Sequence, residues 1–496
     1  MRKNDFDFSK PRRQSEIAIL LFILKTYKVI VGQLWPVLIL FLLRDGFNKP
    51  YLFTGAVILV VMATGFAIWG YYKHTFYING SELVVESGVL QRKKLIIPFD
   101  RIQVVNFEQT VIHQIFEVVR VSVDTAGSTK EECKLDALEK EVAENLRKTL
   151  LFSQNKNIDR EEAADQEPRK GTTDEKFIPI MRLSPGDLLI AGLAENHLKS
   201  GGVIIVFLFW ITEKLREIGL DVDEYADQIP ERDFSLDALL VFGAIFLIIS
   251  VIVSLFRMVM RNYDLRFWRS ENGFKITTGL ITTRMTSALD KKIQTISWHD
   301  NLLKRILGIY DLRFKQASSD TVTISKSIEI VGCRNEHIKF VRQSLYPYFD
   351  PGSIRLEKPS VKMLHRLILF TVLFSSVLFA ASFFFFEELR FLALVSLLYF
   401  CLQFSLQYHK SFYGLNEEML MIKGGAFGNR TTLIPLYKNQ SVEISRSFYQ
   451  RRHGLADVIL YNASGRLKIS YIELEKAKKI ADFVLYTIEK DNRDWM

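Results

Sequence analysis

The chain has 496 residues, a formal net charge of +9 and a pI of about 9.1, and 48% of its residues are hydrophobic, including 38 Phe. This size excludes a single small core, and the hydrophobic content exceeds that of an ordinary soluble multidomain protein. Its three cysteines, Cys133, Cys333 and Cys401, exclude a disulfide framework and favour a reducing compartment.

Residues 1–71 predict a polar N-terminal segment followed by a membrane hairpin. An apolar run from Ile17 is interrupted by Lys25 and Lys28, which predicts an interfacial helix and then a short span ending near Leu43. Residues 53–71 are long and apolar enough for a second span. The connection between these spans is short, so we expect a helical hairpin.

Residues 72–152 predict the first β-rich module. Asn79-Gly80 is a hairpin-turn dipeptide within a strand-forming segment, residues 76–87. Short apolar or alternating runs follow at residues 95–97 and 102–107, as in half-buried strands. A helical pattern over Leu135–Leu151 closes the module. Residues 153–178 are polar without an apolar period and predict a flexible linker.

Residues 179–260 predict an interfacial helix and a second hairpin, with spans near 201–212 and at 238–260. Arg182-Leu-Ser184 matches Arg13-Gln-Ser15 near the start of the chain. The loop between the spans is rich in Asp and Glu, whereas four arginines lie at or just after the C-terminal end of the second span. This bias predicts that the loop lies outside and the following module, residues 261–350, lies inside.

Residues 351–407 predict a third hairpin, with spans at 367–386 and 391–407. Residues 408–496 predict a third module that ends in an amphipathic helix, Ile472–Lys490; the second ends in a helix at Asn335–Leu345. Two spans separate successive modules. The fold class we expect is therefore six transmembrane helices in three hairpins, with all three modules and both termini cytoplasmic.

One segment recurs without a gap in every module. It begins with a glycine and ends with a glutamine, at residues 88–103, 279–294 and 425–440. A glycine between two strands predicts a turn with positive φ. A basic residue also recurs two positions before each glutamine. We interpret these pairs as structural or module-interface residues: Arg101 with Gln103, Lys292 with Gln294, and Lys438 with Gln440.

The paired spans and the sequence Pro98-Phe-Asp-Arg-Ile-Gln103 resemble the bacterial pleckstrin-homology-like domain of the second type. The second copy departs from this pattern with Leu289 in place of Pro, and the first has Glu117 where the others have Gly308 and Gly454. The resemblance implies a small β-sandwich or barrel capped by a helix. It also implies a smaller one-module membrane partner and no established reaction.

The sequence contains few motifs that are typical of catalysis or of metal or phosphate binding. Its eight histidines have no paired metal spacing, and residues 424–428 lack the lysine of a phosphate loop. We therefore predict no enzyme activity, catalytic residue, metal or cofactor, and no nucleic-acid partner. The best ligand candidate is the basic turn Arg92, Lys93 and Lys94, which either contacts anionic lipid head groups or is simply solvated beside the inner leaflet.

Three functional classes stay open. The first is a scaffold of the bacterial cell membrane whose modules bind one another and the one-module partner. The second, compatible with it, is a factor in envelope stress or antimicrobial-peptide resistance. The third is a transporter, exporter or lipid sensor. The predicted spans carry few ionisable residues, which disfavours a transport pathway within this chain.

Overall fold

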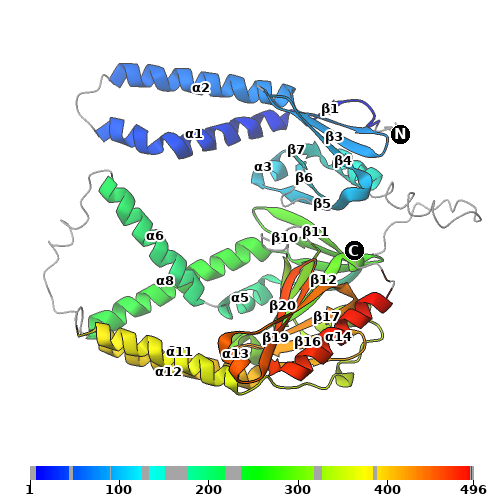
Figure 1. Cartoon of the computed structure of the whole chain (residues 1–496). Coiled ribbons are helices and arrows are strands. Elements are labelled where there is room, and N and C mark those ends of the chain that lie inside the picture. The colour runs from blue at the N-terminus through cyan, green and yellow to red at the C-terminus, as the bar shows by residue number, and fades with distance from the viewer. Residues whose placement is uncertain are drawn as a thin grey trace, which may run out of the picture. The chain divides into compact units, whose positions relative to one another are not determined.

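The computed structural model describes residues 7–43, 49–89, 91–125, 133–150, 177–195, 197–217, 236–317, 327–383, 388–491 and 493 (Figure 1). It divides into two compact units, which are described separately. Unit 1 comprises residues 1–174, 196–264 and 276–287, and unit 2 comprises residues 175–195, 265–275 and 288–496. The boundary crosses the second module. The predicted linker falls almost entirely on residues outside the described part.

Unit 1 contains the first module. A four-stranded sheet has the order β1-β2-β3-β4, and β7, β6 and β5 are also neighbours. The bounds are β1 Arg12–Arg13, β2 Thr75–Asn79, β3 Glu82–Ser87, β4 Lys93–Pro98, η1 Phe99–Arg101, β5 Ile102–Gln109, α3 Val111–Ile115, β6 Val118–Thr125 and β7 Cys133–Glu139. A helix over residues 140–150 packs Leu146 and Leu150 into the core with Phe76, Leu83 and Ile97.

The helix predicted at Leu135–Leu151 begins later than expected. Residues 135–139 belong to β7, where Leu135 lies opposite Val121 of β6. Leu135, Ala137 and Leu138 are all buried, a set that fits one strand with an irregular end as well as one face of a helix. Pairing with β6, a tertiary contact, decides between the two.

Unit 2 holds most of the second module and all of the third. Second-module bounds are β8 Ile178–Arg182, α5 Pro185–Leu193, β9 Arg266–Ser270, β10 Gly273–Thr278, β11 Thr283–Leu289, η2 Asp290–Lys292, β12 Ile293–His299, α9 Leu302–Ile306, β13 Tyr310–Gln316, β14 Ser327–Cys333 and α10 Asn335–Leu345. The strands β10 and β11 extend into unit 1. The bounds of α10 match the prediction.

The third module repeats this order after η3 Pro351–Ser353. Its bounds are β15 Phe412–Leu415, β16 Met419–Gly424, β17 Arg430–Pro435, η4 Leu436–Lys438, β18 Asn439–Ser445, α13 Phe448–Arg452, β19 Leu455–Asn462, β20 Gly465–Glu473 and α14 Leu474–Lys490. The predicted terminal helix is confirmed, with a start two residues later. Its buried face presents Ala477 and Val484 to a core that includes Leu460 and Ile469.

Each module also uses residues that precede its helix pair. β1 pairs with β2, and β8 pairs with β9. In the third module a single bridge joins Glu357 to Tyr413 of β15. The matching segments thus have equivalent places: Arg13-Gln-Ser15 begins at the last residue of β1, and Arg182-Leu-Ser184 begins at the last residue of β8. Each helix pair is therefore inserted between an edge strand and the rest of its module.

In the described residues, the long helices contact one another in three pairs, α1 with α2 and α6 with α8 in unit 1, and α11 with α12 in unit 2. In Figure 1, α1 and α2 lie alongside each other, as do α11 and α12, whereas α6 and α8 cross at a steep angle. Their bounds are α1 Ile17–Leu43, α2 Lys49–Tyr72, α6 His197–Glu217, α8 Leu236–Asn262, α11 Lys362–Ala381 and α12 Glu388–Lys410. Along α1 the helix is continuous rather than an interfacial helix followed by a span.

Two stretches in the described residues are long and apolar enough to cross a membrane, Gly243–Asn262 and Lys362–Ala381. The count of six spans is therefore not reached. Shorter apolar helical stretches occur at Val57–Tyr72 and Ile204–Glu213. Lys25 and Lys28 interrupt α1, and α6 ends in a charged segment, so neither helix offers an uncharged run of full length.

The repeated turn glycines have the conformation that the sequence predicts. Gly88, Gly279 and Gly425 have φ values of 107°, 116° and 118°. A Cβ at Gly279 would lie 1.9 Å from the carbonyl oxygen of Thr282. The glycine is therefore required both by the left-handed backbone and by the close approach of the next turn residue.

Candidate module interfaces

The first contact between modules is a strand pair within unit 1, which we call joint 1. β5 of the first module pairs antiparallel with β11 of the second, with Phe107 opposite Met285 and Glu108 opposite Arg284. The Nε of Arg284 donates to Oε1 of Glu108 at 3.0 Å. Gln114 also donates to the Thr283 hydroxyl at 3.1 Å, and Met285 packs against the core of the first module. Joint 1 thus combines backbone pairing with an ion pair, a side-chain hydrogen bond and an apolar contact.

The second contact, joint 2, lies within unit 2. β12 of the second module pairs antiparallel with β17 of the third, with Trp298 opposite Thr431 and His299 opposite Arg430. In the repeat alignment, Trp298 corresponds to Phe107 of joint 1, and Thr431 corresponds to Met285. The two joints therefore use the same two strands of the module in the same register.

At one end of joint 2, buried polar groups hold the two backbones together. Asp300, which is 7% exposed, donates its backbone N–H to the carbonyl of Asn429 at 2.9 Å. Its carboxylate accepts from the Asn429 backbone N–H at 2.7 Å and pairs with Arg305 at 3.0 Å. A Cβ at Gly428 would lie 2.0 Å from the Asp300 carbonyl oxygen. This approach requires glycine.

Lys438 extends the contact between the second and third modules. Its side chain is 3% exposed, and Nζ donates to the carbonyls of Lys291 and Ile293 at 2.8 and 2.7 Å. A third acceptor, the Asp290 carbonyl, lies at 3.4 Å. Burial lowers the pKa of Lys438 to about 8, against a smaller opposing effect of Asp290. An ammonium group held by carbonyls positions one module on another; no reacting group lies among these contacts.

The other members of the repeated basic–glutamine pairs differ in environment. Arg101 is exposed, Lys292 is half-buried, and Gln440 is exposed. Gln294 is fully buried. The side chain of Gln103 lies outside the described residues. A shared sequence position therefore does not give these residues one shared environment.

Arg92, Lys93 and Lys94 are all exposed. Lys93 and Lys94 belong to β4, at the edge of its sheet, and Lys94 lies 3.6 Å from Glu86. They form a basic strip along a strand. Exposed lysines on an edge strand commonly oppose pairing with another chain, which gives this strip a physical role without a ligand.

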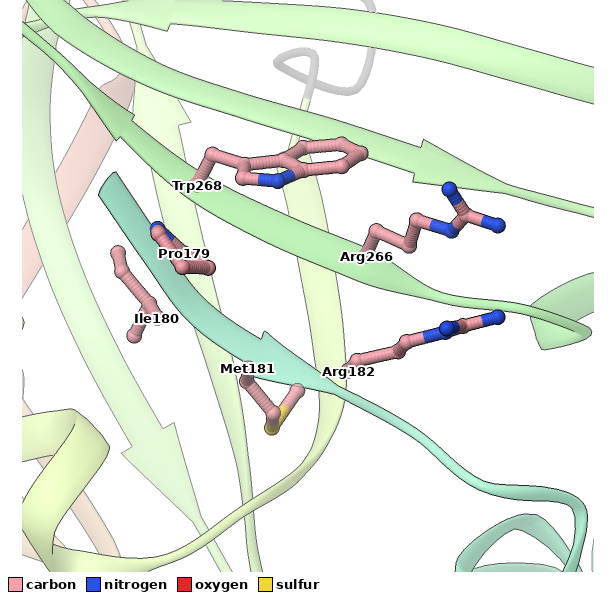
Figure 2. Close-up of a pocket in the computed structure, with 6 residues that line it drawn as sticks. All are labelled: Pro179, Ile180, Met181, Arg182, Arg266 and Trp268. Atoms are coloured by element: carbon pink, nitrogen blue, oxygen red, sulfur yellow. The ribbon is translucent and has the colours of Figure 1, made fainter. Parts of the chain in front are cut away.

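A surface recess in unit 2 gathers other basic residues (Figure 2). It is lined by Pro179, Ile180, Met181 and Arg182 of β8 and by Arg266 and Trp268 of β9. Arg182 and Arg266 occupy directly opposite positions on the two strands. The recess therefore combines two arginines with one tryptophan.

The short helices α3, α9 and α13 share a buried polar position that alignment of the three modules did not reveal. The corresponding residues are His113, Lys304 and Gln450, which are 0%, 3% and 1% exposed. His113 contacts the Asp136 carbonyl, Lys304 contacts Asp311, and Gln450 donates to Asp457. Three different side chains thus anchor the equivalent helix in the three modules. Because the residue type differs, the sequence repeat could not identify this position.

Strands β12, β13 and β14 bring together His299, Asp311 and Glu329, whose ligand-type atoms lie within 4.8 Å of one another. Burial lowers the pKa of His299 to about 4 and raises that of Asp311 to about 6. However, Lys304 already pairs with Asp311, and Arg313 pairs with Glu329 at 2.8 Å. The cluster fits an ion-pair network beside joint 2 better than a metal centre.

Comparisons with known proteins agree with this repeated architecture. A family model described as Bacterial PH domain matches residues 19–153, 217–348 and 368–487. The UPF0699 transmembrane protein YdbT of Bacillus subtilis (strain 168) is 24% identical over 463 residues, covering 90% of this chain and 91% of that protein. No solved structure matches significantly. The chain therefore belongs to the bacterial PH domain family and carries three copies of the domain in a membrane protein.

Proposed function

We propose that this protein is a non-enzymatic membrane scaffold whose modules are held together at their sheet edges. The repeated register of joints 1 and 2 is the observation that carries the proposal. Main-chain pairing gives such contacts affinity, and the helix pairs hold the modules at high local concentration. The features that recur are strands, turns and contacts, which serve shape rather than catalysis.

In this scaffold, three helical hairpins cross the bacterial cell membrane and leave all modules and both termini in the cytoplasm. The net charge of +9 suits a position beside anionic inner-leaflet lipids. A smaller one-module membrane protein is the proposed partner. Envelope stress or resistance to antimicrobial peptides is the proposed setting.

The topology has a direct test. A cysteine replacing Asp223, in the acidic loop, should react with an impermeant thiol reagent on intact cells. A cysteine replacing Arg466 in the third module should react only after permeabilisation. Equal labelling of both cysteines on intact cells would contradict the three-hairpin arrangement.

The scaffold role is tested on protein purified in mild detergent with and without a tagged one-module partner. Cross-linking should show contacts between modules in both samples and retention of the partner. A liposome assay with the purified chain tests the alternative, that the chain alone transports or converts a substrate. If no module contact or partner is found and the chain alone turns over or moves a substrate, the scaffold proposal is wrong.

The arginine recess favours lipid sensing as a second candidate function. Arg182, Arg266 and Trp268 line one recess, and a basic recess at the protein surface suits an anionic head group. Replacing both arginines with glutamine should weaken binding of the detergent-purified chain to anionic vesicles. The Arg92→Gln/Lys93→Gln/Lys94→Gln variant tests the strip on β4 in the same way. Unchanged binding in both variants would exclude both sites as head-group contacts.

A further inference from the structure

The two joints follow one rule. In each, the strand after η1 or η2 pairs with a hairpin strand of the next module. Those hairpin strands share the pattern Arg-x-Thr, as Arg284-Met-Thr286 and Arg430-Thr-Thr432. Arg284 lies opposite Glu108, and Arg430 lies opposite His299, at equivalent positions of the register. The rule specifies both a backbone register and a side-chain pattern.

The corresponding strand of the third module, β18, lies at the edge of its sheet. β18 is an outer strand of the sheet β18-β19-β20, and in the part of the chain that the structure describes no strand pairs with its outer edge. Because β18 pairs with β19 as β12 pairs with β13, this is the edge that β12 uses in joint 2. The third module is thus equipped for one more joint.

The composition of β18 does not protect it against pairing. It reads Asn-Gln-Ser-Val-Glu-Ile-Ser, with no Lys, Arg or Pro, and Ile444 is 37% exposed. The strand at the other side of the same sheet, β20, carries Arg466 and Lys468 and receives a hydrogen bond from Ser360 at Tyr471. Edge strands that avoid pairing usually carry such charges. The two sides of one sheet therefore differ in the way expected for an open and a closed edge.

We propose that β18 accepts an antiparallel strand with the Arg-x-Thr pattern from a module on a separate polypeptide. In the register of the joints, the residue after the arginine lies opposite Ile444 and the arginine lies opposite Ser445. Glu443 is then its diagonal neighbour, within reach of a long side chain. The inference rests on the proposed scaffold function and assigns the surface through which the scaffold binds its partner.

β4, the strand of the first module that corresponds to β11 and β17, does not match this site. β4 has Lys93-Lys-Leu95 where the joints have Arg-x-Thr. In the same register Arg92 of a second copy would lie opposite Arg446, and like charges in opposite positions are destabilising. A second copy that docks through β4 is therefore disfavoured, and the experiment below tests it as the alternative occupant.

The probe is a synthetic peptide of residues 428–435, the β17 sequence, with cysteine in place of Thr431. It is incubated in redox buffer with the full-length detergent-purified chain carrying Ile444→Cys. The matched control carries Arg466→Cys on β20. Docking should raise the yield of mixed disulfide at position 444 about tenfold over position 466, because pairing raises the local thiol concentration. A peptide that also carries Arg430→Glu should return the yield to the control level.

Equal yields at positions 444 and 466 would overturn the proposal. So would peptide-independent disulfide dimers of the Ile444→Cys chain that are abolished by replacing Lys93 and Lys94. A Ser297→Cys/Thr432→Cys chain tests joint 2 in the same buffer, since these residues lie opposite each other. If that disulfide forms while the peptide fails, only the open-edge inference falls. If neither forms, the scaffold function falls as well.

Discussion

Joint 1 and joint 2 share a backbone register but differ in the burial of their polar contacts. In joint 1 the ion pair is exposed, since the Arg284 side chain is 64% exposed. In joint 2 the contacts of Asp300 and Lys438 are buried. Backbone pairing thus defines where two modules meet, whereas the buried side chains determine how strongly they are held. We expect joint 2 to withstand conditions that open joint 1.

The largest effect is expected from Gly428→Ala, which breaks joint 2 alone. The new Cβ would lie 2.0 Å from the Asp300 backbone oxygen, so the strands must separate locally. We expect a loss of about 3 kcal/mol in the stability of unit 2, measured by denaturant unfolding. Gly424→Ala, in the same hairpin with nothing within 4 Å of the new Cβ, is the control. Equal losses for both variants would contradict the role of the close approach.

Gly279→Val should disrupt joint 1 through the hairpin that forms it. A β-branched residue at a φ of 116° is strained, and it collides with Thr282. The expected cost is about 2 kcal/mol, with faster proteolysis near β11. Gly243→Val, at a helical glycine with nothing within 4 Å of the new Cβ, controls for side-chain size. Unchanged protease resistance in Gly279→Val would contradict this.

Lys438→Met should lower the free energy of unfolding by about 1 kcal/mol near neutral pH. The variant loses the hydrogen bonds of Nζ, but it also avoids the unfavourable burial of a charged group, which offsets part of the loss. Since burial lowers the pKa of Lys438 to about 8 from 10.5, the unfolded chain binds more protons than the folded chain between these values. This group therefore adds stability as pH rises through that window. The melting-temperature difference between wild type and Lys438→Met should grow from pH 8 to pH 10. A constant difference would contradict burial of the charged amine.

The smallest effect is expected from Arg284→Gln in joint 1. An exposed ion pair contributes about 0.5 kcal/mol, and salt screens it. A double-mutant cycle with Glu108→Gln should give a coupling energy of that size in low salt and none in high salt. Strong, salt-independent coupling would show that joint 1 is as well protected as joint 2.

The sequence predicted features that depend on local patterns. The turn glycines, α10 and α14 followed from recurrence and amphipathic spacing. The edge strands before each helix pair did not, because a two-residue strand such as β1 has no periodicity. Nor could the joints be predicted, since pairing of Glu108 with Arg284 depends on tertiary contact between distant segments. The buried contacts of Lys438 likewise depend on a neighbouring module, so its recurrence in register with the exposed Arg101 could not reveal them.

The central claim is that equivalent edges join successive modules in one register. Its most direct test is cysteine pairing in native membranes, with Glu108→Cys/Arg284→Cys for joint 1 and His299→Cys/Arg430→Cys for joint 2. Directly opposite residues in a sheet have the spacing that a disulfide needs. Both pairs should oxidise efficiently, and the shifted pairs Asn106→Cys/Arg284→Cys and Ser297→Cys/Arg430→Cys should not. Equal yields for matched and shifted pairs, or no disulfide in either joint, would contradict the account.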